Sequence, residues 1–309
     1  MPRHTNGIIT IDKPEGISSA KVVAIVKKVL KVKKAGHTGT LDPFATGLMI
    51  CCLNSATRIA GFLIKDNKEY EAVLQLGIVT DTGDVTGKII ASSHNIEFSK
   101  QKIYSVFNHF KGRIEQVPPA YSALKHKGVP LYKLARQGRP VKKPARNVII
   151  NDIRILDINL PEIRFKVACS AGTYIRALAS DIGKTLGCGG HLKSLTRMRI
   201  GSFSINDSLK LDELERLSLT KQGSDILSAG IISMTDALPE IPAFHANEKQ
   251  TERIKTGGIM TGHDFHYDYD VLGNSPVKIV DKKNNIIAIV NYDKNKNTYK
   301  YHAVFNNEP

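Results

Sequence analysis

The sequence predicts an α/β protein of the α+β type, in which a large domain is followed by a small C-terminal β-rich domain. Two observations support this. Segments with apolar residues at helical spacing alternate with short runs rich in β-branched residues. After Pro239 and Pro242 come only short strand-like runs, at 277–280, 286–290 and 299–305. We therefore predict domains over 1–240 and 241–309, the second a small barrel or sandwich.

The elements of the large domain follow from local pattern. Ser18 and Ser19 precede apolar residues at 22, 23, 26, 29 and 30, with lysines on the other side, which predicts a basic amphipathic helix. Residues 70–76 alternate as a strand that ends in a turn at 81–84. A strand over 164–169 leads into a helix from about 175 to 186, and 211–217 has a short helical pattern.

Charge is the main compositional clue to function. The formal net charge is +15 and the pI is about 9.6, which favours a polyanionic partner such as nucleic acid or an anionic membrane surface. Residues 241–309 carry 9 Lys or Arg against 8 Asp or Glu, so +14 of the charge lies before them. Two segments contain no acid: 21–34, with six lysines, and 125–146, with eight Lys or Arg. A solvated helix face usually mixes the two signs of charge, so runs without any acid favour a binding role. Ordinary solubilising lysines remain an alternative for each run taken singly.

Several other classes of protein are disfavoured. No apolar run is long enough to span a bilayer, and the N-terminus lacks a signal-peptide core, so we expect a cytoplasmic protein. The four cysteines form no C-x-x-C pair, which predicts small buried residues in a reducing compartment rather than a disulfide framework or a zinc site. His263 and His266 lack further ligands, and a surface turn is expected there. No complete phosphate-binding loop, dinucleotide fingerprint or zinc deaminase signature is present.

The segment 36–47, GHTGTLDPFATG, is the densest candidate site. Its three glycines and a proline after Asp42 describe a tight loop that can lie close to a ligand. Taken alone, an Asp before a Pro is more often a turn former than a catalytic group. Here it follows a basic helix, so we expect nearby cations to lower the pKa of Asp42 and keep it ionised as a nucleophile or base.

This segment resembles the catalytic loop of the TruB type of pseudouridine synthase, which forms pseudouridine 55 in tRNA. Further motifs occur in the family's order: GIITIDKPEGISS at 7–19, KEY at 68–70, LGIVTDTGD at 76–84, PPAYSALKHKG at 118–128, LYKLAR at 131–136, CSAGTYIRALASDIG at 169–183 and GCGGHLKSLTR at 187–197. Departures at Thr40, Phe44 and Thr196 remove no apparent catalytic group. The resemblance implies a pseudouridine synthase fold on a mixed, largely antiparallel sheet. It also implies that the C-terminal domain is similar to a PUA module.

The resemblance also implies roles for individual residues. Asp42 matches the catalytic aspartate, Tyr70 the active-site tyrosine that stacks on the base, and Arg176 the arginine that pairs with the aspartate. His37, Tyr174, Leu195 and Lys13 match positions near the target nucleoside, and Asp84 matches one that places a turn. Without the resemblance, His37 would be interpreted as a buried structural histidine and Tyr70 as an ordinary strand tyrosine. Arg176 would be interpreted as a surface arginine of a helix.

The implied substrate is the T stem-loop of tRNA, with uridine 55 taken out of its stack. Lys142, Lys143 and Arg146, from the second basic run, are expected to bind its backbone. No metal, organic cofactor, guide RNA or obligatory protein partner is implied, and we expect a monomer. The alternatives are a catalytically silent protein of the same fold that binds or folds tRNA and, third, a membrane-surface protein.

Overall fold

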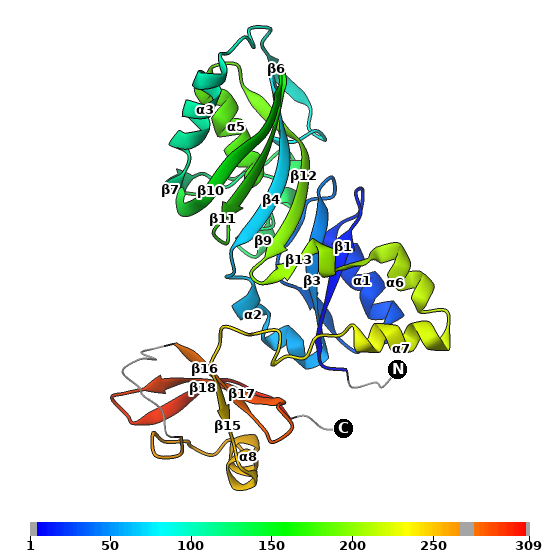
Figure 1. Ribbon diagram of the computed structural model, residues 1–309. Helices are drawn as coiled ribbons and strands as arrows, with labels where there is room; N and C mark the ends of the chain where they lie inside the picture. The colour runs from blue at the N-terminus through cyan, green and yellow to red at the C-terminus, as the bar shows by residue number, and fades with distance from the viewer. Residues whose placement is uncertain (1–4, 266–274, 307–309) are drawn as a thin grey trace.

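The computed structural model describes residues 5–265 and 275–306, and its centre is one long, twisted mixed sheet (Figure 1). The strand order is β14-β1-β3-β12-β4-β11-β10-β7, with β13 paired to β12 and β2 to β3. Only β1 with β14 and β3 with β12 pair in parallel along this order. The predicted fold class, with its mixed and largely antiparallel sheet, is confirmed.

One end of the sheet is built from β1 (Gly7–Lys13), β2 (Ala35–His37), β3 (Thr46–Leu53) and β14 (Leu209–Lys210). The predicted basic helix is α1 (Ser19–Val29), and it packs beside these strands (Figure 1). Its N-terminus is capped by the Ser18 side chain, which accepts from the Lys21 amide at 3.2 Å. Val22 and Val26 are buried while Lys21, Lys27 and Lys28 stay exposed, so hydrophobic burial orients the basic face outward.

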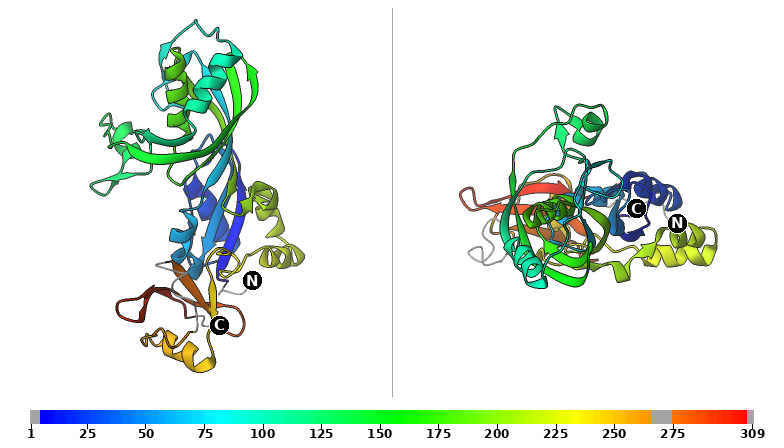
Figure 2. Two further views of the ribbon diagram at one scale, coloured as in Figure 1. Left: turned by 60° about the vertical axis from the view of Figure 1, so that its left-hand side comes forward. Right: turned by 90° about the horizontal axis from the view of Figure 1, so that it is seen from above.

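The other end contains β4 (Lys68–Leu76), β11 (Glu162–Cys169), β10 (Arg146–Asn159) and β7 (Gly112–Gln116), covered by α3 (Lys100–His109) and α5 (Ile175–Leu186) (Figures 1 and 2). Alternate residues of β4 are buried, as its pattern predicts. Helix α5 ends at Gly187, whose φ of 93° is a left-handed cap that glycine adopts without strain. Strand β12 (Gly190–Ile200) joins the two ends, because it pairs with β3 and with β4.

The basic segment after β7 projects from the sheet as an arm (Figure 2). It contains the hairpin β8 (Lys125–His126) and β9 (Val129–Pro130), then α4 (Leu131–Arg136) and an irregular stretch to β10. The remaining elements of the large domain are η1 (Asn54–Arg58), α2 (Ala60–Leu63), β5 (Ile78–Thr80), β6 (Ile89–Ser92), β13 (Phe203–Ser204), η2 (Ile205–Asp207), α6 (Leu211–Leu217) and α7 (Lys221–Ala229).

The C-terminal residues form a four-stranded sheet of β15 (Ala243–His245), β16 (Pro276–Val280), β17 (Ile286–Asp293) and β18 (Thr298–Val304), with helix α8 (Glu248–Lys255). The three strands predicted in this region are confirmed, and within the described residues they form one sheet together with β15, so the sandwich alternative, which needs two sheets, is not supported. One apolar cluster of this sheet includes Ile254 of α8, and another, with Ile289 and Phe305, includes Ile8 and Leu48 of the large domain. Helix α8 and the large domain therefore bury apolar residues of this sheet, so a second sheet is not needed for that purpose. The division at residue 241 stays a prediction.

Two expectations about composition can be compared with the structure. The four cysteines are buried and unpaired, which confirms their interpretation as small core residues. No described helix combines the length and the apolar character that crossing a bilayer requires.

Candidate active site

The sequence-predicted residues converge on a cavity of about 510 Å³ between the Asp42 loop, β4, the start of α5 and β12. Asp42, Tyr70, Arg176, Tyr174 and Leu195 line this cavity, which also touches the arm at Ser122 to Leu124. Its volume lies within the range of about 300–1,000 Å³ that is usual for small-molecule sites. These five predicted residues come from four separate segments, and Arg146, a sixth, joins them from the start of β10.

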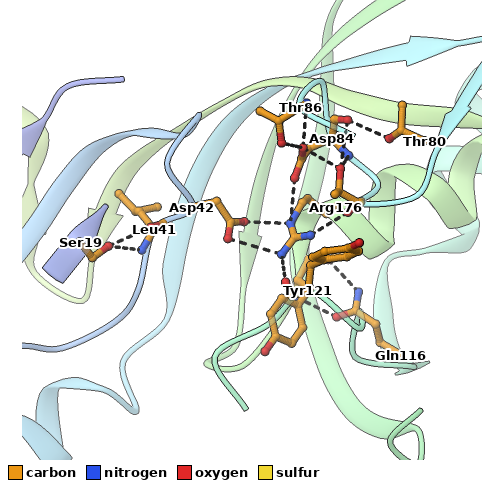
Figure 3. Close-up of polar contacts among 11 residues, drawn as sticks. Ser19, Leu41, Asp42, Thr80, Asp84, Thr86, Gln116, Tyr121 and Arg176 are labelled. Atoms are coloured by element: carbon orange, nitrogen blue, oxygen red, sulfur yellow. Dashed lines mark hydrogen bonds and ion pairs between the residues drawn. The ribbon is translucent and has the colours of Figure 1, made fainter. Parts of the chain in front are cut away.

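The loop that carries Asp42 is held on both sides of the aspartate. The Ser19 hydroxyl, buried at the start of α1, donates to the Leu41 carbonyl at 2.9 Å and accepts from the Leu41 amide at 2.8 Å (Figure 3). On the other side, the Lys13 ammonium donates to the Pro43 carbonyl at 3.2 Å, and the Gly16 amide donates to the same oxygen at 2.8 Å. The carboxylate is thus presented by a loop with little freedom to move.

Arg176 lies at the centre of the polar network (Figure 3). Its Nε is 2.8 Å from Asp42 Oδ2 and its Nη2 is 3.4 Å from Oδ1, so the guanidinium fork faces both carboxylate oxygens. The remaining donors reach the Thr82 carbonyl at 2.7 Å and the Tyr121 carbonyl at 2.6 Å. The arginine side chain is 4 % exposed and the aspartate 34 % exposed, so Arg176 is a buried support and Asp42 is the group that a ligand can reach.

Asp84 lies behind this pair. Its Oδ1 accepts from the side chains of Thr82 and Thr86 and from the Thr86 amide, and its Oδ2 is 3.6 Å from Arg176 Nε. It both holds the turn, as the sequence suggested, and places a second negative charge near Asp42.

Burial dominates the ionisation of Asp42. It raises the pKa of this carboxyl, Arg176 opposes that rise, and the charge of Asp84 adds to it. The expectation of a lowered pKa is therefore wrong, because it considered neighbouring cations without the cost of removing the carboxylate from water.

Two aromatic side chains, Tyr70 and Tyr174, line the cavity. Tyr70, in β4, is 8 % exposed, and Tyr174 is the residue before the first turn of α5. Arg146 lies over the Tyr174 ring, 4.9 Å from its centroid, and donates to the Gly172 carbonyl. Leu195 is buried in β12 and supplies an apolar wall. A flat base could stack in such a site.

Two of the residues expected near the target nucleoside, Lys13 and His37, do not line the cavity. Lys13 is fully buried and donates to three carbonyls, so it supports the loop from behind. Burial lowers the pKa of Lys13 to about 8. His37 does not line the cavity, and its Nδ1 accepts from the Gly39 amide at 3.2 Å. Lys142 and Lys143 lie outside the cavity, in the irregular stretch before β10, where Lys142 is exposed. The expected contact of Lys142 and Lys143 with the RNA backbone stays a prediction. Arg146, which was grouped with them, lines the cavity.

Sequence reasoning missed three buried groups of the site. Ser19 was noted only as part of a helix start. Gln116 holds the start of α5, because its amide donates to the Tyr174 carbonyl at 3.0 Å and accepts from the Tyr174 amide at 2.7 Å. Arg197 is 2 % exposed and lines the cavity. The last residue of GCGGHLKSLTR was a visible signal for Arg197, whereas nothing local distinguishes Gln116.

The described residues contain no group of three or more His, Cys, Asp or Glu side chains placed to hold a metal ion. His266 lies outside the described residues, so the expectation of a surface turn at His263 and His266 is untested as a pair. That no metal is required stays a prediction.

The chain is similar to known proteins over most of its length. Residues 27–175 match the model described as TruB family pseudouridylate synthase (N terminal domain), and 176–238 match the tRNA pseudouridylate synthase B C-terminal domain. The chain is 41 % identical over 292 residues to tRNA pseudouridine synthase B of Francisella tularensis subsp. tularensis (strain FSC 198), covering 94 % of this chain and 92 % of that protein. The protein of the same name from Francisella philomiragia is also 41 % identical, with the same coverage.

Among solved structures, the chain resembles an archaeal box H/ACA sRNP Nop10-Cbf5 complex, with 25 % identity and a TM-score of 0.73 over 98 % of this chain and 86 % of that one. A Cbf5-Nop10-Gar1 complex gives 26 % identity and a TM-score of 0.74, covering 98 % and 85 % of the two chains. The similarity therefore extends over both sheets of the present chain.

Proposed function

The chain belongs to the TruB family of pseudouridylate synthases, and we propose that it isomerises uridine 55 in the T loop of tRNA to pseudouridine. The observation that carries this proposal is the buried Arg176, which orients the partly exposed Asp42 at a cavity that Tyr70 and Tyr174 also line. Relatives at 41 % identity over nearly the whole chain bear the name tRNA pseudouridine synthase B. The chain is thus a tRNA-modifying isomerase.

The reaction breaks the bond between N1 of the uracil and C1′ of the ribose and forms a bond between C5 and C1′. C5 loses a proton and N1 gains one, so atoms and electrons balance without a redox or phosphoryl co-reactant. Asp42 is proposed to act on the sugar or the base as a nucleophile, or to remove a sugar proton. Arg176 keeps its carboxylate oriented and favours the ionised form.

The remaining cavity residues are proposed to hold the base. Tyr70 stacks on the uracil and its hydroxyl lies near the proton lost from C5, while Tyr174 and Leu195 contact the nucleoside. A stacked loop base is inaccessible to Asp42, so the nucleotide must turn out of its stack at a cost of a few kcal/mol. Stacking on the aromatic rings and phosphate contacts along the arm offset that cost.

The test is incubation of the purified chain with unmodified tRNA transcript, followed by carbodiimide-dependent primer-extension mapping of pseudouridine. We expect one stop, at position 55, and the same product from an isolated T stem-loop. Tight binding without any stop would favour the silent RNA-binding alternative, for which no feature of the site argues. A stop elsewhere would contradict the proposed target.

We further propose that the chain works alone, as a cytoplasmic monomer, without guide RNA. The relatives at 41 % identity are named tRNA pseudouridine synthase B, a name that mentions no RNA or protein partner, whereas the neighbours solved in Cbf5 complexes are only 25 and 26 % identical to this chain. Light scattering during size-exclusion chromatography, combined with activity of the isolated chain, tests this.

Activity is also expected to persist in excess EDTA and without any nucleotide, because the reaction only rearranges bonds. Loss of turnover on chelation, restored by one added metal ion, would contradict this expectation.

A further inference from the structure

Arg197 is a buried cation that the proposed mechanism does not use. It ranks among the largest fully buried side chains of the protein, yet it lines the active-site cavity. Within the described residues, no carboxylate lies at ion-pair distance from it, whereas Arg176 is paired with Asp42 and Asp84. Burying an uncompensated charge is costly, so a site that retains one is expected to use it.

The surroundings of Arg197 hold it in one place. Its Nε donates to the Leu48 carbonyl at 2.7 Å, and its Nη2 donates to the Gly39 carbonyl at 3.1 Å. The backbone of β3 approaches so closely that a Cβ at Gly47 would lie 2.4 Å from the Arg197 carbonyl oxygen. Only glycine fits at Gly47, so main chain and guanidinium are both fixed.

Tyr70 is the cross-strand partner of Arg197 in the pairing of β12 with β4. The charged and titratable groups that act on its hydroxyl are Arg197 from β12, Cys169 from β11 and Asp42 from its loop. Burial raises the pKa of Tyr70, and Arg197 opposes that rise by Coulomb attraction and by hydrogen bonding, whereas Asp42 adds to it. Burial also raises the pKa of Cys169 to about 11, so Arg197 is the cationic member of this set.

The same charge acts on the other basic groups around the site. Burial lowers the pKa of His37, and Arg197 lowers it further; burial and then Arg197 likewise lower the pKa of Lys68, to about 8. Arg197 is thus a fixed positive centre that disfavours positive charge on its basic neighbours. Its attraction is left for an anion that forms within the cavity.

We propose that Arg197 is a positioning residue for Tyr70, which holds the tyrosine hydroxyl toward the base and stabilises negative charge on its oxygen. This rests on the proposed role of Tyr70 near C5. The Tyr70 proton goes to solvent, the phenolate oxygen accepts the proton from C5, and the neutral phenol is restored. Arg197 itself forms and breaks no covalent bond.

The test titrates Tyr70 directly, so it needs no turnover. A difluorotyrosine placed at position 70 is more acidic than tyrosine, which brings its ionisation into a range where the chain stays folded, and ¹⁹F NMR reports that one ring. In Arg197→Gln, which keeps a donor for the Leu48 carbonyl, the midpoint should rise by about one pH unit or more. Arg197→Lys, whose single ammonium cannot replace the guanidinium fork, should raise it by a smaller amount.

Arg199→Gln is the matched control, because Arg199 lies on the same strand, is 43 % exposed and contacts Glu69 instead of the cavity. Its midpoint should equal that of the parent chain. An unchanged midpoint in either folded Arg197 variant overturns the inference, and the Lys variant keeps the test decisive if the Gln variant fails to fold. A chain that shows the shift but makes no pseudouridine would retain the Arg197–Tyr70 coupling while contradicting the proposed function.

Discussion

At the scale of single residues, the site depends on groups that hold Asp42 more than on groups beside it in sequence. Ser19 and Lys13 restrain the residues on either side of it, and Arg176 orients the carboxylate. These contacts are to backbone groups or to the carboxylate, in buried or partly buried positions where a lost partner is costly. Small changes at Asp42 should therefore alter chemistry without altering the loop.

Asp42→Asn should abolish pseudouridine formation while RNA affinity stays within about tenfold, or roughly 1.4 kcal/mol. The amide keeps the shape and can still contact Arg176, but it cannot serve as nucleophile or base. Single-turnover assays and filter binding on the same RNA measure the two quantities. Turnover at the parent rate would remove Asp42 from the mechanism.

The pH dependence of kcat/KM should reflect the raised pKa of Asp42. Because the carboxylate must be ionised to act, activity is lost as pH falls through this pKa, which burial places above the ordinary 3.8. Asp84→Asn removes a like charge that raises the pKa of Asp42, so the acid limb should move to lower pH.

Asp157→Asn, an exposed change on β10, is the control for this measurement and should leave the profile in place. Superimposable acid limbs for Asp84→Asn and the parent chain would show that Asp84 only holds its turn.

At the scale of elements, the basic arm is anchored directly on the active site. The arm begins after Gln116, the last residue of β7, and ends at Arg146, the first residue of β10. Gln116 hydrogen-bonds the backbone of Tyr174, and Arg146 lies over the Tyr174 ring. Between them, the Tyr121 carbonyl accepts from Arg176. The arm therefore contacts Arg176 once, through Tyr121, and contacts Tyr174 twice, through Gln116 and Arg146. We expect RNA bound along the arm to act on the site through these contacts, and we expect the exposed lysines of the arm to contribute to RNA affinity alone.

Changing Lys142 and Lys143 together to Ala should make the slope of log K against log salt shallower by up to about two units, because each phosphate contact contributes slightly less than one. The single-turnover rate at saturating RNA should stay the same. Arg146→Ala should instead lower that rate, since it removes the contact with Tyr174 and the bond to Gly172.

The matched control is the double change of Lys282 and Lys283 to Ala, two adjacent lysines in the nearly neutral C-terminal stretch. If the slope is the same in the arm variant and in the parent chain, the RNA backbone lies across another face.

At the scale of the whole molecule, the C-terminal sheet is built onto the large domain. Lys278 of β16 is 6 % exposed and donates to the carbonyls of Thr235 and Leu238, at 2.9 and 2.7 Å. In addition, Ile289 of the C-terminal sheet and Phe305, just after β18, pack in the same apolar cluster as Ile8 of β1. The orientation of the two sheets is thus determined by buried contacts in addition to the connecting chain.

Lys278→Met should lower the free energy of unfolding by about 1–3 kcal/mol, because two buried carbonyls lose their donor. Lys282→Met, on an exposed turn where the lysine pairs only with an exposed glutamate, should change it by less than about 0.5 kcal/mol. Urea denaturation followed by circular dichroism measures both. Equal midpoints for the two variants would mean that Lys278 contributes nothing to the junction.

The sequence by itself determined the local elements and the chemistry of the main loop. The extents of α5 and α6 follow from apolar spacing, and the alternation of β4 from one buried face, because both are short-range properties of neighbouring residues. The resemblance of the loop and its companion motifs to a family identified Asp42, Tyr70 and Arg176 as partners.

Only the tertiary structure decided how these residues work together. Burial raises the pKa of Asp42, opposite to the expected direction, and Lys13 points into the protein. Arg146 lies at the cavity, whereas Lys142 and Lys143 lie outside it. Strand pairing places Arg197 opposite Tyr70. The tertiary structure also shows that helix α8 and the large domain pack on the C-terminal sheet, for which the sequence predicted only a small barrel or sandwich. Desolvation, strand register and packing between sheets depend on residues distant in the chain, and these are the terms that a local pattern does not contain.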